Sequence, residues 1–442
     1  MCSGPKHSVV VWRRQESGEA EQWGKASVHS ASCWVTGVSP GAGGLAGWVG
    51  VCMCQDIYQL ESHLERLTQI RNPIAPNDAR GTARSYIRGQ MQQYGLKLHL
   101  HTFNTTVNIN GNPTTVLGEN VVGVAKGNGD RGGVLVVGAD YDTSMEHHPL
   151  EDNGAGVGVM LETARNYMAA TNPVSLDQPA PFAALKTVIF VAFDLNTREY
   201  GEAEVGQPGS FHFLHQWLWP FLDQSPENLT GVIILDSITR FNQEPKSQFL
   251  PSGFEKTFPK AFEHINEGGM KGNFLAAYIR DSPSSQNLSQ TFTTSYLMDR
   301  KARLVRLEEL KVSDGATVND RVLQTFNHQA QFHFWTFQPS TQPTPLPAIL
   351  LTDTGIYRQP GTNDSCAVPC SASQFLSRPR RTALTIITTA LTNTLLNLQS
   401  QRLPTSSSSS SGGENTDGNA AASPLSFMVA TFLLPQLVHL LH

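Results

Sequence analysis

Continuous apolar runs alternate along this chain with segments in which apolar residues recur every three or four positions. A continuous run of β-branched and apolar residues is typical of a strand buried on both faces, and the three-to-four spacing is typical of a helix with one buried side. Alternation of the two patterns favours an α/β fold. Buried strands are predicted at residues 134–137, 187–193, 231–236 and 346–354, and helices at 57–71, 79–94, 157–164 and 381–399.

Three other segments belong to the same predicted domain. Residues 96–107 alternate between apolar and polar positions and residues 120–124 form an apolar run, which together predict a hairpin-like entry to the central strand. Residues 268–326 lack a clear period and are predicted to hold two amphipathic segments joined by a loop. We therefore predict one large α/β domain at residues 55–400, with a mixed sheet of about eight strands flanked by helices.

The two ends of the chain differ in composition from this domain. Residues 1–54 carry scattered Trp, Cys, Gly and Ser with little periodicity. A weakly apolar stretch at 41–54 lies too far from Met1 for an ordinary secretory signal, so we interpret the segment as an alternative or wrongly assigned N-terminal exon. After the domain, residues 401–423 form a Ser/Gly-rich stalk and residues 424–442 a hydrophobic tail.

The stalk and tail together are typical of a signal for attaching a glycosylphosphatidylinositol lipid. A serine run and a small-residue zone precede the apolar tail, and no basic cluster follows it. The attachment residue is predicted between Ser411 and Ala421. A single membrane-spanning tail is the alternative, which Pro435 and Gln436 make less favourable. The prediction is a lipid-anchored protein on the extracellular face of the plasma membrane.

Net charge indicates which partners are excluded, and the cysteines and glycosylation sequons indicate the cellular compartment. A net charge of -5 and a pI near 6.3 provide no basic field for nucleic acid. Cys366 and Cys370 are the only cysteines within the predicted domain, and they favour a small disulfide over a metal pair that lacks further ligands. N-x-S/T sequons, which favour a secretory route, occur at Asn104, Asn228, Asn287 and Asn363.

Acidic residues gather around the strand predicted at 134–137. Asp140 and Asp142 follow this strand directly, and Asp152 precedes the next predicted helix. Because open α/β sheets bind ligands at the carboxyl ends of their strands, these side chains predict a divalent-metal crevice. Helix capping and turn formation by the same residue types are the alternative interpretation.

The motifs around these acids resemble those of the co-catalytic zinc aminopeptidase family, which includes aminopeptidase Y, glutamate carboxypeptidase, glutaminyl cyclase, transferrin receptor and nicastrin. The family's G-A-H-Y-D-S, D-D-N-G-S-G and L-E-x-A-R correspond here to G-A-D-Y-D-T, E-D-N-G-A-G and L-E-T-A-R. The resemblance implies a zinc-exopeptidase fold. It implies that Asp152 bridges two zinc ions, that Asp142 supports the first metal ligand, and that Asp236 is a further ligand.

The chain departs from the family at several catalytic positions. Asp140 stands at the first histidine ligand, and Asn363 at the last. The family's general base and its neighbouring zinc ligand, F-D-G-E-E-x-G, become Asn196 and Thr197 in a gap-free alignment. A two-residue insertion would instead place Arg198 and Glu199 there, again without a carboxylate at the base position. Where relatives carry aspartate and histidine before A-x-F-W, this chain has residues 328 and 329, His and Gln.

These departures favour a protein of the peptidase family that acts by binding a peptide or protein ligand. Carboxylates alone have lost much of the preference for zinc, so a single hard cation or no metal is expected. The alternative is an active aminopeptidase or carboxypeptidase that uses zinc with substituted ligands, with Asp140, Asp152 and Asp236 on the metal and Glu199 in catalysis. A receptor module without metal is the third interpretation. His147 and His148 lie between the acid pairs and are predicted to be solvated.

Overall fold

The computed structural model divides the chain into two units, Met1–Leu403 and Pro404–His442. All described residues lie in the first unit. They are residues 57–109, 111–128, 132–171, 185–197, 206–225, 227–313, 330–337, 345–361, 366 and 370–400.

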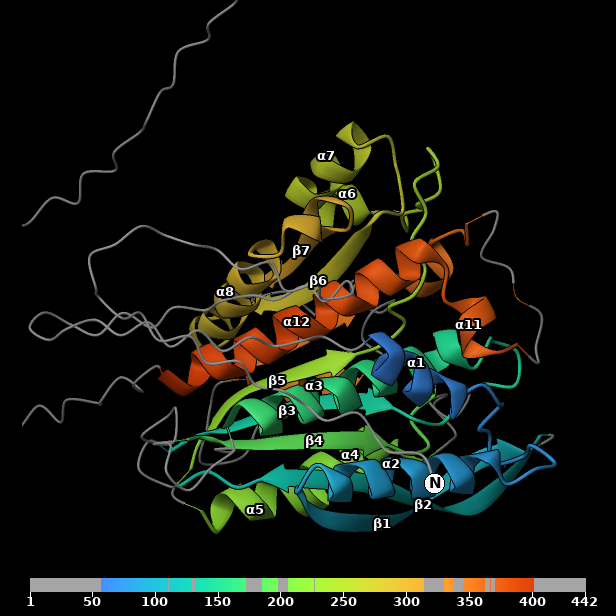
Figure 1. Ribbon diagram of the computed structural model, residues 1–442, viewed down its shortest axis with the longest axis vertical. Helices are drawn as coiled ribbons and strands as arrows, with labels where there is room; N and C mark the ends of the chain where they lie inside the picture. The colour runs from blue at the N-terminus through green and yellow to red at the C-terminus, as the bar shows by residue number, and fades with distance from the viewer. Residues whose placement is uncertain are drawn as a thin grey trace, which may run out of the picture. The chain divides into compact units, whose positions relative to one another are not determined.

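A single mixed sheet of eight strands forms the centre of this unit (Figure 1). Its order is β1-β2-β4-β3-β5-β8-β6-β7, in which β4, β3, β5 and β8 run parallel. On one side, β2 pairs antiparallel with both β1 and β4; on the other, β6 pairs antiparallel with β8 and parallel with β7. The predicted α/β fold with about eight strands is confirmed. The strands are β1 Lys97–Ile109, β2 Asn112–Ala125, β3 Val134–Asp140, β4 Thr187–Phe193, β5 Leu229–Leu235, β6 Phe274–Asp281, β7 Arg306–Ser313 and β8 Ala348–Thr352.

Helices cover both faces of the sheet. One face carries α1 Ile57–Glu65, α2 Ala79–Gln93, α3 Ala155–Thr171, α8 Pro283–Leu297, α11 Ala372–Phe375 and α12 Arg378–Ser400. The other carries α4 Gly209–His212, η3 Phe213–Leu218, α5 Trp219–Asp223, α6 Phe254–Thr257, α7 Pro259–Glu267 and α10 Ala330–Thr336. Short turns at the strand ends are η1 Leu150–Gly154, η4 Arg300–Arg303 and η5 Gly355–Tyr357.

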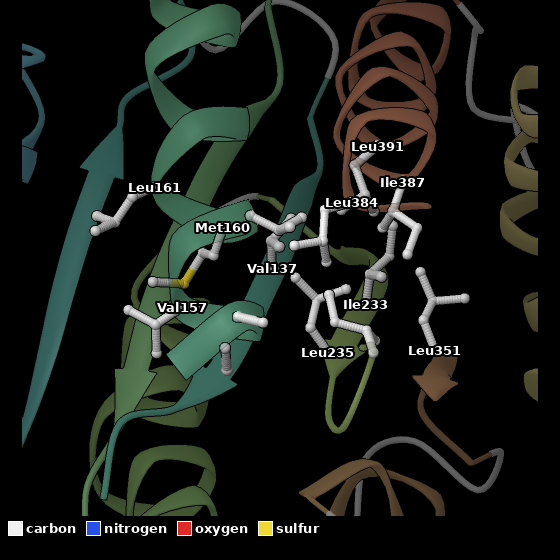
Figure 2. Close-up of a cluster of buried hydrophobic side chains, with 14 of the residues drawn as sticks. Val137, Val157, Met160, Leu161, Ile233, Leu235, Leu351, Leu384, Ile387 and Leu391 are labelled. Carbon is white, nitrogen blue, oxygen red and sulfur yellow. The ribbon is translucent and has the colours of Figure 1, made fainter. Parts of the chain in front are cut away.

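Alternating side chains of the central strands supply two separate cores. Successive side chains of a strand point to opposite faces, so Val137 faces α3 and α12 while Val136 faces the opposite helices. In Figure 2, side chains of α3 and α12 meet those of β3, β5 and β8. Each fully buried side chain of this kind contributes roughly 1.5–3 kcal/mol by leaving water. The long helix α12 thereby fixes the ends of the strands that carry the acidic residues.

The segment predicted as two amphipathic stretches folds differently. Residues 268–326 contain the strands β6 and β7 and the helix α8 between them. β7 lies at the sheet edge and alternates between buried and exposed positions, and β6 is a buried apolar run of only eight residues. Such a short apolar run is ambiguous between strand and helix. Among the described residues, no helix combines the length and hydropathy that crossing a bilayer requires.

Candidate functional site

The carboxyl ends of the parallel strands meet at one edge of the sheet and surround a cavity of about 170 Å³. Polar residues follow each of these strands, as the crevice rule for α/β sheets predicts. A loop and η1 close the cavity from the side. The residues that matter most for its chemistry are Asp140 at the end of β3, Asn196 and Thr197 after β4, Asp236 after β5, Asp353 after β8, and Asp152 in η1.

Asp152 is held in place through the residue that follows it. The Asn153 side chain donates from Nδ2 to the Leu235 carbonyl at 2.6 Å and accepts from the Ser237 N–H at 3.2 Å, which ties η1 to the end of β5. The peptide bond between Asp152 and Asn153 is cis. Asp152 Oδ2 accepts from the Ser144 N–H at 2.7 Å. These bonds bring Asp152 to the cavity that Asp140 and Asp236 also line.

Asp140 is a buried carboxylate whose Oδ1 has no hydrogen-bond partner among the described residues. Burial raises the pKa of this carboxyl well above its usual range, and the nearby charges of Asp236 and Asp142 raise it further. A hydrogen bond with the Asn196 side chain acts in the opposite direction. Asp140 is therefore an acid that favours its protonated form.

The Asp142 carboxylate supports the backbone of the turn after β4. Its two carboxylate oxygens accept from the Asn196 N–H, each at 3.1 Å, and Oδ2 also accepts from the Thr197 N–H at 3.2 Å. Burial raises the pKa of Asp142 to about 7, and the Asp194 carboxylate adds to the rise. Asp142 is not among the residues that line the cavity. It fixes the turn after β4, which does face the cavity.

That turn places an amide and a hydroxyl in the cavity wall. Asn196 Oδ1 accepts from Ser210 twice, from the N–H at 3.0 Å and from the hydroxyl at 2.6 Å. Thr197 Oγ1 is buried without a partner among the described residues. Neither side chain accepts a proton from a metal-bound water near neutral pH. Asn196 and Thr197, the two residues of the gap-free alignment, therefore line the same cavity as Asp140 and Asp236.

A second set of acids at the same cavity is fully partnered by arginine or backbone groups. Glu151 pairs with Arg240 at 3.0 Å and with Arg380 at 2.8 Å. Asp353 accepts from the N–H groups of Thr239, Arg240 and Gly355 at 2.6–2.8 Å. Buried charges paired in this way are retained at a much smaller cost than isolated ones.

The donor set that the described residues place around the cavity differs from that of most zinc sites. Zinc sites are built mainly from imidazole and thiolate, whereas Asp140, Asp152 and Asp236 offer only oxygen and His147 is the one imidazole in the described cavity wall. Among the described residues, one trio of His, Cys, Asp or Glu side chains brings its ligand atoms within 4.8 Å of one another, and it is His148, Cys366 and Cys370. The two sulfurs of that trio are bonded to each other, with Cα atoms 5.9 Å apart. A disulfide sulfur is not the thiolate that binds metals.

Other predicted residues fall in different places. Glu199 and Asn363, like Arg198 and residues 328–329, lie outside the described residues. His147 lines the cavity and shares a hydrogen bond of 2.8 Å with the Ser144 hydroxyl. His148 instead stacks on Phe375 with ring centroids 4.8 Å apart. The sequon residues Asn104, Asn228 and Asn287 are exposed.

Two buried arginines that were not predicted from the sequence support the site. Arg71 is buried and donates to the Tyr141 carbonyl at 2.6 Å and the Pro149 carbonyl at 2.9 Å, which joins the first loop to both acid-bearing segments. Arg358 is buried as well and donates to the carbonyls of Arg240 and Phe274. The position of Arg71 before Asn72 and Pro73 indicated only the end of a helix.

The sheet order and the acids at its carboxyl edge define a protein of the zinc-exopeptidase-like α/β class. Residues 120–292 match the model of peptidase family M28, which confirms the predicted relationship to the co-catalytic zinc peptidases. No curated protein matches the sequence.

Solved structures with a similar arrangement are distant in sequence. A glutaminyl cyclase of Tannerella forsythia is 15% identical, with 78% of this chain and 99% of that chain covered at a TM-score of 0.45. The LapA aminopeptidase of Legionella pneumophila is also 15% identical, with 79% and 73% covered at 0.45. A putative zinc-dependent exopeptidase from Bacteroides vulgatus is 13% identical, with 77% and 94% covered at 0.41.

Proposed function

We propose that this protein is a non-hydrolytic relative of peptidase family M28 that binds a peptide or protein ligand in the cavity at the carboxyl edge of its sheet. The observation that carries the proposal is the turn after β4. Asn196 and Thr197 take part in the cavity wall there, and Asn196 is fixed by two hydrogen bonds from Ser210. An amide in this position holds a ligand but does not activate water.

The charge of the cavity indicates which ligand groups it accepts. Asp140 and Asp236 raise each other's cost of ionisation, and Asp140 Oδ1 is without a partner among the described residues. A positive ligand group placed between them favours the ionised carboxylates and satisfies that oxygen. The free amino group of a peptide has this charge and donates the required hydrogen bonds. We therefore expect peptides with a free N-terminus to bind better than the same peptides after acetylation.

Elemental analysis of the purified full chain, combined with hydrolysis assays on aminoacyl substrates with and without chelator, tests the proposal. We expect substoichiometric zinc and no turnover. Calorimetric titration should in parallel detect binding of a free-amine peptide, and Asp140→Asn should weaken that binding about tenfold or more, as for loss of a charged hydrogen bond. A chain that neither turns over substrate nor distinguishes free from acetylated peptides would contradict the binding role.

An active metallopeptidase is the second candidate, and one observation favours it. The three acids at the family's metal positions, Asp140, Asp152 and Asp236, line a single cavity. In this case zinc would be the cofactor and Glu199 the residue to test for catalysis. Near-stoichiometric zinc with turnover that disappears in chelator, and again in Glu199→Gln, would replace the binding proposal by this one.

We also propose that the protein is held on the extracellular face of the plasma membrane by a C-terminal lipid anchor. The apolar segment at residues 424–442 and the exposure of Asn104, Asn228 and Asn287 support this location. Release from intact cells by a phosphatidylinositol-specific phospholipase, with a mobility shift after removal of N-linked glycans, is the expected result. Retention on the cell after the phospholipase would favour a membrane-spanning tail.

A further inference from the structure

A patch of exposed apolar side chains lies where α8 ends and η4 begins. Leu297 is 63% exposed, Met298 56% and Leu304 51%, and all three are within eight residues of one another in the sequence. Most other exposed large apolar residues of the described chain are scattered singly. Several apolar side chains exposed together usually mark a surface that meets a partner.

Three cations occur in the same stretch of the chain. Arg300, Lys301 and Arg303 are exposed, and none of them forms an ion pair with a described residue. The acid in the same stretch, Asp299, is buried and accepts from the Lys301 N–H at 2.8 Å. The patch is therefore apolar and positive, although the whole chain carries a net charge of -5. We call these six residues, 297, 298, 300, 301, 303 and 304, the interfacial patch.

The backbone beneath the interfacial patch is held by buried contacts. Ala302 lies between the cations and is buried in the core, and Val305 is buried directly after Leu304. The Tyr296 hydroxyl donates to the Val305 carbonyl at 2.9 Å, which joins the end of α8 to the start of β7. The patch is consequently presented by a fixed turn, so little ordering entropy is lost when it meets a partner.

The interfacial patch lies beside the end of the helix from which the chain continues toward its apolar segment. Asn397 Nδ2 in α12 donates to the Ser295 hydroxyl in α8 at 3.3 Å, one helical turn before Met298. α12 ends at Ser400. The sequence then reaches the apolar segment 424–442 through 23 residues, 401–423.

We propose that the interfacial patch docks on a phospholipid bilayer that contains anionic headgroups, and this proposal is independent of the lipid anchor and of the membrane face proposed above. Leu297, Met298 and Leu304 would enter the headgroup region, while Arg300, Lys301 and Arg303 would remain at the level of the phosphates. Basic residues near an anionic membrane each contribute about 1 kcal/mol, or roughly a fivefold change in partition. This proposal goes beyond ligand binding in the cavity, because none of the six residues lines it.

Vesicle flotation of the full chain tests the proposal, with vesicles of 70% phosphatidylcholine and 30% phosphatidylserine against vesicles of phosphatidylcholine alone. The variant Arg300→Gln/Lys301→Gln/Arg303→Gln should lower partition to the anionic vesicles about tenfold or more. The variant Leu297→Ser/Met298→Ser/Leu304→Ser should lower partition to both vesicle types. Any contribution of residues 424–442 is the same in all variants and does not affect these differences.

A matched control carries the same change of charge elsewhere on the surface. Arg66→Gln/Arg88→Gln/Lys97→Gln alters the net charge equally at exposed positions on other elements, and it should partition like the unchanged chain.

A photoactivatable phosphatidylcholine in the same vesicles locates the contact directly. Cross-links should map to residues 297–304 of the bound chain. The proposal is overturned if bound chain cross-links only elsewhere, if the control variant loses as much as the patch variants, or if the chain does not bind vesicles. In the last case the patch would be left as a contact surface for another protein.

Discussion

Asp353 and Asp140 occupy equivalent places and have opposite surroundings. Asp140 is the last residue of the parallel strand β3, and Asp353 directly follows the parallel strand β8. Each lines the same cavity and is at most 6% exposed. Asp353 accepts from three backbone N–H groups and lies near Arg358, which lowers its pKa against the effect of burial. Asp140 has one oxygen without a partner in the described structure and lies near further acids. Position in the fold alone therefore does not distinguish a structural acid from one available to a ligand.

The difference between the two acids has an energetic meaning. A buried carboxylate is tolerated when hydrogen bonds and opposite charge compensate for lost hydration. Asp353 has this compensation within the protein. Asp140 has a hydrogen bond with Asn196 but lies near like charges, so a ligand group or a proton must provide the remaining compensation. We infer that Asp353 stabilises the fold, whereas Asp140 needs a ligand group or a proton to compensate for its burial.

The largest expected effect is the loss of Asp353. Asp353→Ala leaves three backbone donors without their acceptor and removes the negative charge near the buried Arg358 guanidinium, which should lower the free energy of unfolding by about 3–5 kcal/mol. Denaturant unfolding followed by circular dichroism measures this change. Asp140→Ala is the matched control and should not destabilise the protein. Equal losses in the two variants would show that Asp353 and Asp140 contribute alike to stability.

The next effect has the opposite sign. Asp140→Asn removes a carboxyl group whose ionisation is opposed by burial and by the charge of Asp236, while keeping the size of the side chain. We expect the free energy of unfolding at pH 7 without ligand to rise by about 1–2 kcal/mol. Thermal unfolding in chelator-treated buffer is the measurement. A clear loss of stability on this substitution would indicate that a bound cation already compensates Asp140.

The gain from Asp140→Asn should depend on pH. The pKa of Asp140 is raised in the folded protein, so above pH 4 the folded state holds a proton that the unfolded state has lost, and stability falls as pH rises. The gain should therefore be small near pH 4 and grow toward pH 7. Burial lowers the pKa of His63 to about 4, which makes stability rise with pH over part of this range. Because both proteins contain His63, the difference between their curves isolates the acid, and a pH-independent gain would contradict the assignment.

The smallest expected effect concerns an exposed pair. Lys311 lies 2.9 Å from Glu309 on β7, and the lysine side chain is 53% exposed. Lys311→Gln should change the free energy of unfolding by less than about 0.5 kcal/mol, since water and salt screen such pairs. Urea unfolding resolves a difference of this size. A loss comparable to that of Asp353→Ala would show that burial does not govern the strength of charge pairing here.

Much of the fold was predictable because buried elements have local patterns. The strand predicted at 187–193 is β4 without any change of boundary, and the helix predicted at 381–399 is α12 within three residues at its start. The strands β6 and β7 were missed, because an eight-residue apolar run and an edge strand give weak periods.

The site was predictable only in part, for a different reason. Acids at the end of a strand or just before a helix can be recognised from the sequence pattern. Asp140, Asp152 and Asp236 were therefore correctly expected to share one crevice. Which acid is neutralised depends on partners far away in the sequence. Arg380 pairs with Glu151 across 229 positions, and no local pattern indicates that contact.

The ribbon of β1 and β2 is unequally supported along its length. The two strands pair with each other from Lys97 to Ile109, yet only residues 121–125 of β2 also pair with β4. Backbone amides in the far part of the ribbon can therefore exchange with deuterium through local opening, whereas amides of β3 are released only when the sheet itself unfolds. The ribbon and the central strands should thus behave as separate cooperative units, with the acids of the cavity belonging to the slower one.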